Sequence, residues 1–361
     1  MKKIGLIVSI FLLFSTAVLV AFTRPVLAAG TIYIRADETI SGTDKIQRDG
    51  NIYTFTGNIY DSVVVARDNI VVDGAGYTLQ GTGTGVGILL SSRSYVTIKN
   101  VQIKSFVYGI SLEVSYNNSI VGNTITENYY NGIQLYESSN NNIVGNNITA
   151  TEYSGIFLYN SNNNSVVGNH ISANIGGALE CYMSSGNTFK DNYLTNNNYG
   201  IDLYGRSSNN SVVENNISNN WYGIQLQSSS NNSVVSNNVS NNTIGIEPTT
   251  YSNNNRIFRN NFMNNTYQTM SSEEYSNNER VININIWDDG KEGNYWSNYN
   301  GTDSNGDGTG DTPYVIDENN QDNHPLLNVI PEFPSWIILP LFMMATLLAV
   351  MLKKRKHITQ Q

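Results

Sequence analysis

Aromatic side chains recur beside amide and carboxyl side chains at one place in a repeated stretch of the chain. The positions are Gln134 and Tyr136, Phe157 and Tyr159, Asp202 and Tyr204, and Gln225. Sugar rings stack on aromatic faces and form hydrogen bonds with amides and carboxylates, so this set is a candidate carbohydrate-binding surface. A second aromatic series, with Trp221 beside it, comprises Tyr108, Tyr130, Tyr153, Tyr199 and Tyr222. The alternative is that stacked rings only shield turns and reinforce a parallel ladder.

Paired carboxylates are the other candidate for chemistry, because glycoside cleavage uses two of them at a fixed separation. Asp202 follows Glu180 at the repeat distance, and Glu247 follows Gln225, but we expect no continuous acidic column. The stretch "IGGALECYM" leaves open whether Glu180 or Leu179 faces the core, and we expect a β-bulge with Leu179 inside. No Lys or Arg cluster is placed to neutralise an acidic polysaccharide. We therefore assign no catalytic residue and keep Asp202 as the candidate for an enzyme reading.

The stretch "DSNGDGTGDTPY" has the oxygen ligands and the glycine turn of a calcium loop. Asp303, Asn305, Asp307, Thr309 and Asp311 alternate around Gly308, as hard cations such as Ca²⁺ require. Tyr314 stands where such loops carry a bidentate carboxylate. We expect a structural Ca²⁺ site here, and the alternative is a solvated Asp-Gly turn.

A strict repeat must position all of these residues. An asparagine that precedes a second apolar pair recurs at steps of 23, 23, 23, 23, 22 and 23 residues, at Asn123, Asn146, Asn169, Asn192, Asn215, Asn237 and Asn260. Each period shows two-fold alternation, as in "GIQLY", and Gly, Asn and Ser turns, so it holds two or three short strands. One period cannot bury its apolar face alone, and stacked periods pair their strands in parallel about 4.8 Å apart.

The sequence therefore predicts an all-β chain that forms a single-stranded, right-handed parallel β-helix with 22–23 residues per coil. We expect about nine or ten coils over residues 63–286, in a rod roughly 45 Å long. The recurring asparagines should stack in one file as a structural ladder, at bends where Asn tolerates left-handed dihedrals. Residues 30–62 and 287–330 are expected to form the N-terminal and C-terminal caps.

These motifs resemble the NosD-type, or CASH-type, right-handed β-helix family of secreted carbohydrate-binding and sugar-cleaving proteins. The repeats "NSVVGN" and "YGI", the segment 52–81 and the segment 293–327 with "GNYWSNYNGTDSNGDGTGDTPYVIDENNQDNHPLL" carry the resemblance. It covers most of residues 31–327, and it is more specific for fold than for function, because the fold hosts lyases, hydrolases, epimerases and binders.

The resemblance also raises a copper-site accessory function. The soft and imidazole ligands of the region between the two termini are His170, His324, Cys181, Met183, Met263 and Met270, without Met-x-Met or His-x-His pairs. This spacing argues against copper binding.

The two ends of the chain predict export and anchoring. Residues 1–29 read as a signal peptide, with Lys2 and Lys3 before an apolar run. Residues 336–352 are apolar or small, just long enough to cross a bilayer, and residues 353–361 form a basic cytoplasmic tail. The "PEFPS" motif within the 331–352 segment resembles sorting signals processed on some archaeal envelopes.

Charge and sequons fit an exported domain. Residues 30–335 hold all 29 acidic side chains and 13 of the 20 basic ones, a net charge of −16, which argues against nucleic acid as a partner. The lone Cys181 cannot form an internal disulfide. Ten Asn-x-Ser/Thr sites predict N-glycosylation, at Asn117, Asn147, Asn163, Asn209, Asn216, Asn231, Asn238, Asn241, Asn264 and Asn300.

Two functions follow as hypotheses. The first is a membrane-anchored cell-surface protein, non-catalytic, that binds an extracellular glycan or serves as envelope material. The second is a polysaccharide-active lyase, hydrolase or epimerase on the same fold.

Overall fold

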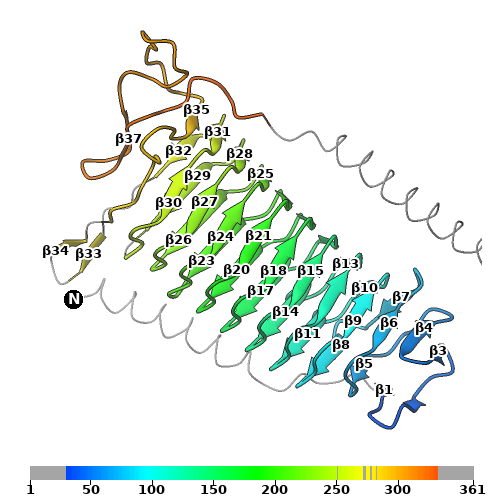
Figure 1. Ribbon diagram of the computed structural model, residues 1–361. Helices are drawn as coiled ribbons and strands as arrows, with labels where there is room; N and C mark the ends of the chain where they lie inside the picture. The colour runs from blue at the N-terminus through cyan, green and yellow to red at the C-terminus, as the bar shows by residue number, and fades with distance from the viewer. Residues whose placement is uncertain (1–29, 250, 271–273, 277–278, 282, 332–361) are drawn as a thin grey trace, which may run out of the picture.

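The computed structural model describes residues 30–249, 251–270, 274–276, 279–281 and 283–331. The chain winds into a parallel β-helix in which each full coil adds one strand to each of three sheets (Figure 1). The helix has about nine turns, in agreement with the predicted nine or ten. The predicted signal peptide, membrane helix and basic tail lie outside the described residues. Within the described part of the chain, no helix is long and apolar enough to cross a bilayer.

The first sheet has twelve strands and carries the outer face on which the candidate site lies. All its neighbours pair in parallel except the terminal pair β1 and β2, which is antiparallel. In spatial order its strands are β2 (Ile40–Ser41), β1 (Ile32–Ile34), β5 (Val63–Val65), β8 (Val86–Ser91), β11 (Tyr108–Glu113), β14 (Ile133–Tyr136), β17 (Ile156–Tyr159), β20 (Gly177–Tyr182), β23 (Tyr199–Tyr204), β26 (Tyr222–Gln227), β29 (Ile244–Pro248) and β32 (Tyr267–Thr269).

The second sheet has eleven strands and begins with the antiparallel pair β3 and β4. Its order is β3 (Ile46–Asp49), β4 (Ile52–Phe55), β6 (Val71–Asp73), β9 (Thr97–Lys99), β12 (Ser119–Val121), β15 (Asn142–Val144), β18 (Ser165–Val167), β21 (Thr188–Lys190), β24 (Ser211–Val213), β27 (Ser233–Val235) and β30 (Arg256–Phe258). Because β1 and β4 already pair in parallel with β5 and β6, the solenoid begins inside the segment predicted as the N-terminal cap.

The third sheet has ten strands, and two short hairpins complete the described structure. From its C-terminal end the order is β35 (Tyr295–Trp296), β31 (Asn261–Met263), β28 (Asn238–Ser240), β25 (Asn216–Ser218), β22 (Tyr193–Thr195), β19 (His170–Ser172), β16 (Asn147–Thr149), β13 (Thr124–Thr126), β10 (Gln102–Lys104) and β7 (Thr78–Gln80). The hairpins are β33 (Glu274–Ser276) with β34 (Glu279–Val281), and β36 (Tyr314–Val315) with β37 (Gln321–Asp322).

The core is a thin apolar filling between the three sheets. The triplet of each coil points two apolar side chains inward, so that Ile133 and Leu135 are fully buried, as are Ile156 and Leu158 in the next coil. Side chains alternate along a strand, so the residues between them point outward. Because equivalent apolar residues of successive coils stack on one another, the narrow core excludes water along the rod.

The predicted asparagine ladder is confirmed. Asn146 Oδ1 accepts the backbone N–H of Asn123 at 2.9 Å and its side-chain amide at 3.0 Å, while Asn146 Nδ2 donates to the carbonyl of Ile120. The pattern repeats at Asn169, where Oδ1 accepts from Asn146 in the same way. Each amide therefore satisfies buried backbone groups at a corner that no strand hydrogen bond reaches.

The ladder asparagines do not adopt left-handed dihedrals themselves, contrary to the prediction. The residue before each of them does, as at Gly145 (φ 62°) and Asp191 (φ 54°). The left-handed residue turns the chain, and the asparagine that follows it can then point its amide into the coil. The first of the two residues therefore provides the left-handed turn, and the asparagine that follows provides the hydrogen bonds.

Three further ladders run parallel to the first, at the other corners of the coil. One ladder joins the asparagines Asn118, Asn141, Asn164, Asn187, Asn210, Asn232, Asn255, Asn285 and Asn320. Another joins the serines Ser115, Ser138, Ser161, Ser184, Ser207, Ser229 and Ser252. The last begins with a threonine and joins Thr151, Asn174, Asn197, Asn220, Asn242 and Asn265. These ladders explain why the repeat contains so much Asn and Ser.

The ladder that begins with Thr151 has a defect at Asn128, the equivalent position one coil earlier. Asn128 Oδ1 accepts the N–H of Phe106 at 3.1 Å, but its buried Nδ2 has no hydrogen-bond partner. The equivalent position one coil further on is Thr151, which has no amide oxygen to accept it and instead donates to Asn174. A buried donor without an acceptor is destabilising.

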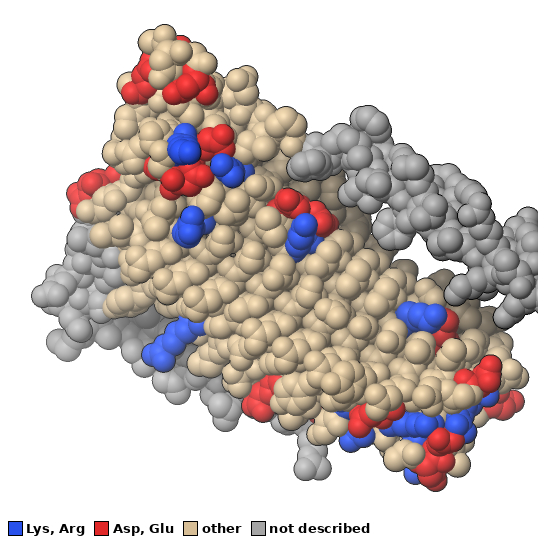
Figure 2. All heavy atoms as spheres, in the orientation of Figure 1, with Lys and Arg blue, Asp and Glu red and all other residues tan. Residues whose placement is uncertain are grey.

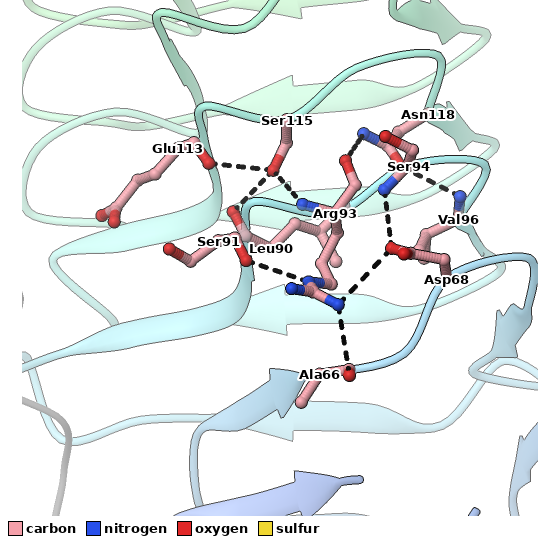
Figure 3. A network of polar contacts seen from close by, with 10 residues as sticks. All are labelled: Ala66, Asp68, Leu90, Ser91, Arg93, Ser94, Val96, Glu113, Ser115 and Asn118. Atoms are coloured by element: carbon pink, nitrogen blue, oxygen red, sulfur yellow. Dashed lines mark hydrogen bonds and ion pairs between the residues drawn. The ribbon is translucent and has the colours of Figure 1, made fainter. Parts of the chain in front are cut away.

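In the first coils Arg93 starts the serine ladder, and Val96 takes the place of the repeat asparagine and donates its N–H to Asn118 Oδ1 (Figure 3). Ser115 Oγ accepts the N–H of Arg93 at 3.0 Å, and Asn118 Nδ2 donates to the Arg93 carbonyl at 3.1 Å. The Arg93 guanidinium donates to the carbonyls of Ala66 and Ser91 and pairs with Asp68. The side chain and the backbone of Arg93 together thus connect three successive coils at the N-terminal end of the rod.

Aromatic residues close the other end of the core. Trp296 stacks between Phe262 and Tyr314, with centroids 4.6 and 4.4 Å away. Asn294 and then Asp322 continue the predicted ladder beyond Asn260. Asp322 accepts the Asn294 N–H at 2.7 Å and the Trp296 indole N–H at 2.9 Å. On the face shown in Figure 2, charged side chains gather at both ends of the rod, with a mostly uncharged surface between them.

Candidate functional site

The outer face of the twelve-stranded sheet brings together the residues that the sequence predicted for carbohydrate binding. Strand register aligns one outward residue per coil along the centre of this face, in the order Ser111, Gln134, Phe157, Glu180, Asp202, Gln225 and Glu247. We call this series the central column. Gln134, Phe157 and Glu180 are partly exposed, whereas Asp202, Gln225 and Glu247 are buried.

A tyrosine column flanks the central column on the C-terminal side of the strands. It consists of Glu113, Tyr136, Tyr159, Tyr182, Tyr204 and Gln227. The rings of Tyr136 and Tyr159 stack 5.0 Å apart with an interplanar angle of 8°. The ring of Tyr182 is tilted by 34° from that of Tyr159 and by 43° from that of Tyr204. Tyr182 was missed in the sequence because the register of its coil was misread.

A second tyrosine column flanks the opposite side, at the start of the strands. Tyr130 and Tyr153 stack 4.1 Å apart at 10°, and Tyr199 and Tyr222 stack 5.1 Å apart at 11°. Tyr108 tilts by 57° against Tyr130. Between the two stacked pairs, one coil carries glycines in place of a tyrosine. We call the central column with its two flanking columns the tyrosine face.

The register of the "IGGALECYM" coil is now fixed. Leu179 pairs with Ile156 and Ile201 and is buried, so the expectation that Leu179 faces the core is confirmed. The strand pairs continuously with both neighbours, so the expected β-bulge is wrong. Ala178 takes the place of the usual repeat glycine, and the preceding Gly177 misled the alignment of the sequence. Glu180 therefore points outward, and Cys181 fills the apolar slot.

The central column contains its carboxyl groups at the spacing that the repeat distance predicted. Glu180 and Asp202 are direct neighbours, and Glu247 follows after Gln225. Amides separate and bind the carboxylates: Gln225 Nε2 donates to Glu247 Oε2 at 2.5 Å, and Gln227 Nε2 lies 3.4 Å from both oxygens of Asp202. As expected, no continuous acidic column forms, because Gln225 separates Asp202 from Glu247.

The electrostatics of this column favour protonated carboxyl groups. Burial and the neighbouring carboxylates of Glu180 and Glu247 raise the pKa of Asp202 well above its usual value. Burial likewise raises the pKa of Glu180, opposed by hydrogen bonds from Ser154 and from the Gly177 N–H, the latter 2.7 Å long. None of the residues of the three columns is basic, so charge here is relieved by protons, by amides or by a ligand.

The predicted calcium loop folds as a set of tight turns. Asp303 Oδ1 and Oδ2 accept backbone N–H groups of Gly306 and Gly308 at 2.6 and 2.9 Å. Asp307 accepts the Thr309 hydroxyl, and Asp311 accepts the Ser304 hydroxyl. Among the described residues, no three His, Cys, Asp or Glu side chains gather as a metal site. Calcium binding by this loop, with Asn305 as a further ligand, stays a prediction.

The residues weighed for copper lie on separate elements. Cys181 is buried in the core, and burial raises the pKa of its thiol well above the usual value. His170 lies on β19, where its Nδ1 is 3.2 Å from Asn147 Oδ1, and His324 lies in the C-terminal cap. Met183 occupies a corner of the coil. Among the described residues, no hydrogen bond joins any two of these side chains.

Comparisons with known proteins agree with this architecture. The family model "Right handed beta helix region" matches residues 60–217, and the model "Periplasmic copper-binding protein (NosD)" matches residues 179–301. The chain is a NosD-type right-handed β-helix protein. The predicted handedness and family are thereby confirmed. The NosD-type chain matches no curated protein sequence.

Solved structures similar to this NosD-type protein include enzymes and a tailspike protein. The A-module of mannuronan C-5 epimerase AlgE4 from Azotobacter vinelandii is 15% identical, with 64% of this chain and 71% of that chain covered and a TM-score of 0.48. The Dettilon tailspike protein is 17% identical, with coverage of 67% and 60% and a TM-score of 0.48. Pectate lyase Pel9A is 12% identical, with coverage of 63% and 66% and a TM-score of 0.41.

Proposed function

We propose that this NosD-type β-helix protein binds carbohydrate at the cell surface along its tyrosine face. The observation that carries the proposal is the alignment of two tyrosine columns on either side of a column of amide and carboxyl groups. Aromatic rings with nearby hydrogen-bonding groups suit sugars, which present apolar C–H faces and hydroxyl edges.

The charges of the face indicate the class of glycan. Glu113, Glu180, Asp202 and Glu247 lie in the three columns, and none of their members is basic. A polymer of uronic acids would place further carboxylates against these groups without a compensating cation. Neutral or amine-bearing glycans therefore fit better than acidic ones.

The partly exposed part of the central column supplies the variants for a test. Gln134 and Phe157 point outward, one coil apart, and their substitution leaves the core untouched. An array of neutral, amine-bearing and acidic glycans is probed with purified full-length protein and with a Gln134→Ala, Phe157→Ala double variant. We expect binding to neutral or amine-bearing glycans that the double variant loses. Absence of binding to any glycan, or equal binding by the variant, would overturn the proposal.

An enzyme reading retains one specific observation in its favour. Glu180 and Asp202 lie on adjacent coils, so their backbones are about 4.8 Å apart. Retaining glycosidases hold their two carboxyl groups about 5–5.5 Å apart, and the raised pKa of Asp202 would suit a general acid. Release of reducing ends from polysaccharides, abolished by Asp202→Ala, would place catalysis above binding.

The surface location rests on the two predicted terminal segments. A protease added to intact cells should remove the β-helix from the outside if the C-terminal segment anchors it in the membrane. Resistance of the protein in intact cells, with digestion after lysis, would contradict the proposed location.

A further inference from the structure

The outer face of the eleven-stranded sheet carries an apolar column that the core does not use. Strand register aligns the third residue of each short strand from β9 to β30. We call this series the valine column; its members are Lys99, Val121, Val144, Val167, Lys190, Val213, Val235 and Phe258. Its five valines are half-buried or exposed, with Val144 36% exposed.

The equivalent column of the ten-stranded sheet is hydroxylic. The third residues of its strands from β10 to β28 are Lys104, Thr126, Thr149, Ser172, Thr195, Ser218 and Ser240, and all seven are half-buried. Both sheets are built from three-residue strands between ladder corners. Valine and threonine are both β-branched and both favour strands, so the fold does not require valine on one sheet and hydroxyl groups on the other. The valines instead fit a surface that loses its water in a contact.

The side chains beside the valine column are small, so the face has no large projections along its middle. The outward residues at the start of the same strands are Thr97, Ser119, Asn142, Ser165, Thr188, Ser211 and Ser233. Their spacing along the rod is the strand spacing of about 4.8 Å, and another sheet can pack on such a face about 10 Å away. A second copy of this chain has the same spacing, so its valines match this column coil by coil.

The charges in the middle of the face are complementary to themselves. Lys190 Nζ lies 3.0 Å from Glu214 Oε2 and 3.8 Å from Asp191 Oδ2. A twofold axis along the strands, between β21 and β24, makes the two rods antiparallel and stacks valine column on valine column. Lys190 of each copy then lies over the coil of Val213 and Glu214 in the other copy. Parallel rods would instead place the two Lys190 side chains on facing coils.

The size of the face is sufficient for a dimer. Eight strands from β9 to β30 span about 38 Å, and the strand with one corner residue on each side is about 17 Å wide. Two copies would bury about 1,300 Å² in total, which lies at the lower end of the range for stable protein interfaces, about 1,200–2,000 Å².

We propose that two copies of this protein associate through their eleven-stranded sheets, with antiparallel rods and the two valine columns in contact. The tyrosine face lies on the twelve-stranded sheet, so it stays open in this dimer and the proposal does not depend on glycan binding.

The test uses matched charge substitutions on two sheets. Full-length protein in density-matched detergent is followed by sedimentation velocity from about 1 to about 100 µM. We compare wild type with a Val144→Lys, Val167→Lys variant and a Thr149→Lys, Ser172→Lys control, whose changes lie on the same two coils. Lysine already stands in both columns, at Lys190 and at Lys104, so both variants should fold, which far-UV circular dichroism checks.

We expect a dimer for wild type and for the control, and dimerisation weaker by roughly 10-fold or more for the valine variant, because it buries unpaired charges. A wild-type protein that stays monomeric over the whole range would overturn the proposal. So would a valine variant that dimerises as tightly as the control.

Cross-linking tests the antiparallel arrangement. The twofold axis places Val213 one coil from Val213 of the second copy, whereas the two Val121 side chains lie seven coils, or about 34 Å, apart. A short bis-maleimide should therefore join Val213→Cys chains into dimers and leave Val121→Cys chains single. The native Cys181 is buried, and the unsubstituted protein measures its background reaction. Equal cross-linking at the two positions would show that the rods do not pack antiparallel and would overturn the proposed arrangement.

Discussion

Asn169→Ala removes one rung from the middle of the predicted asparagine ladder. In the folded protein Asn169 Oδ1 accepts both the backbone N–H and the side-chain amide of Asn146, at 2.9 and 3.0 Å, and Asn169 Nδ2 donates to the carbonyl of Ile143. The alanine leaves the two Asn146 donors buried without an acceptor. Each stranded group costs about 1–3 kcal/mol, so we expect a loss of about 2–6 kcal/mol in unfolding free energy.

The control is Asn142→Ala, one coil earlier on the exposed side of β15, where a surface substitution should stay within about 0.5 kcal/mol. Urea unfolding followed by far-UV circular dichroism gives the global effect. Hydrogen exchange at the Asn146 N–H reports local opening, because coils of a solenoid interact only with their neighbours. A loss for Asn169→Ala no larger than that for Asn142→Ala would refute the ladder as a source of stability.

Three further predictions address the ladder defect, the cap and the calcium loop. Thr151→Asn supplies an acceptor for Asn128 Nδ2 and should raise unfolding free energy by about 1 kcal/mol in the same urea assay; a lower stability would contradict the interpretation of the defect. Burial raises the pKa of Asp322 to about 6. The folded state therefore holds this proton more tightly than the unfolded chain, and stability should fall by about 3 kcal/mol as pH rises from about 4 to above 6. Asp322→Asn should remove that fall, which unfolding at pH 4 and pH 7 measures, and an unchanged pH dependence would contradict it. Calcium should raise the Tm of the wild-type protein and leave that of Asp307→Ala unchanged, and an equal response of both would argue against the loop as a site.

The sequence predicted the parts of the structure that the repeat enforces. A period of 22 or 23 residues requires equivalent residues to stack, so the core triplets, the Asn146 ladder and the alignment of Tyr136 with Tyr159 all followed from it. The further ladders followed the same rule, but their Asn and Ser residues could not be separated from ordinary turn residues without knowing which side chains point inward.

The parts that failed lie where one coil departs from the repeat. Gly177 resembles the repeat glycine, while Ala178 is its true equivalent, and only the hydrogen-bonded register separates the two. This displacement hid the place of Tyr182 in its column. Ring orientation was also beyond the sequence, because spacing aligns tyrosines without showing which of their faces are covered.

Oxidative labelling of tyrosines with and without the best-binding glycan, read residue by residue by mass spectrometry, tests the central claim most directly. The account predicts that the glycan protects tyrosines of the tyrosine face, Tyr153 among them, and leaves Tyr193 on the ten-stranded sheet as reactive as in the free protein; the two are 50% and 52% exposed. Protection of Tyr193 with no change on the tyrosine face would contradict carbohydrate binding there.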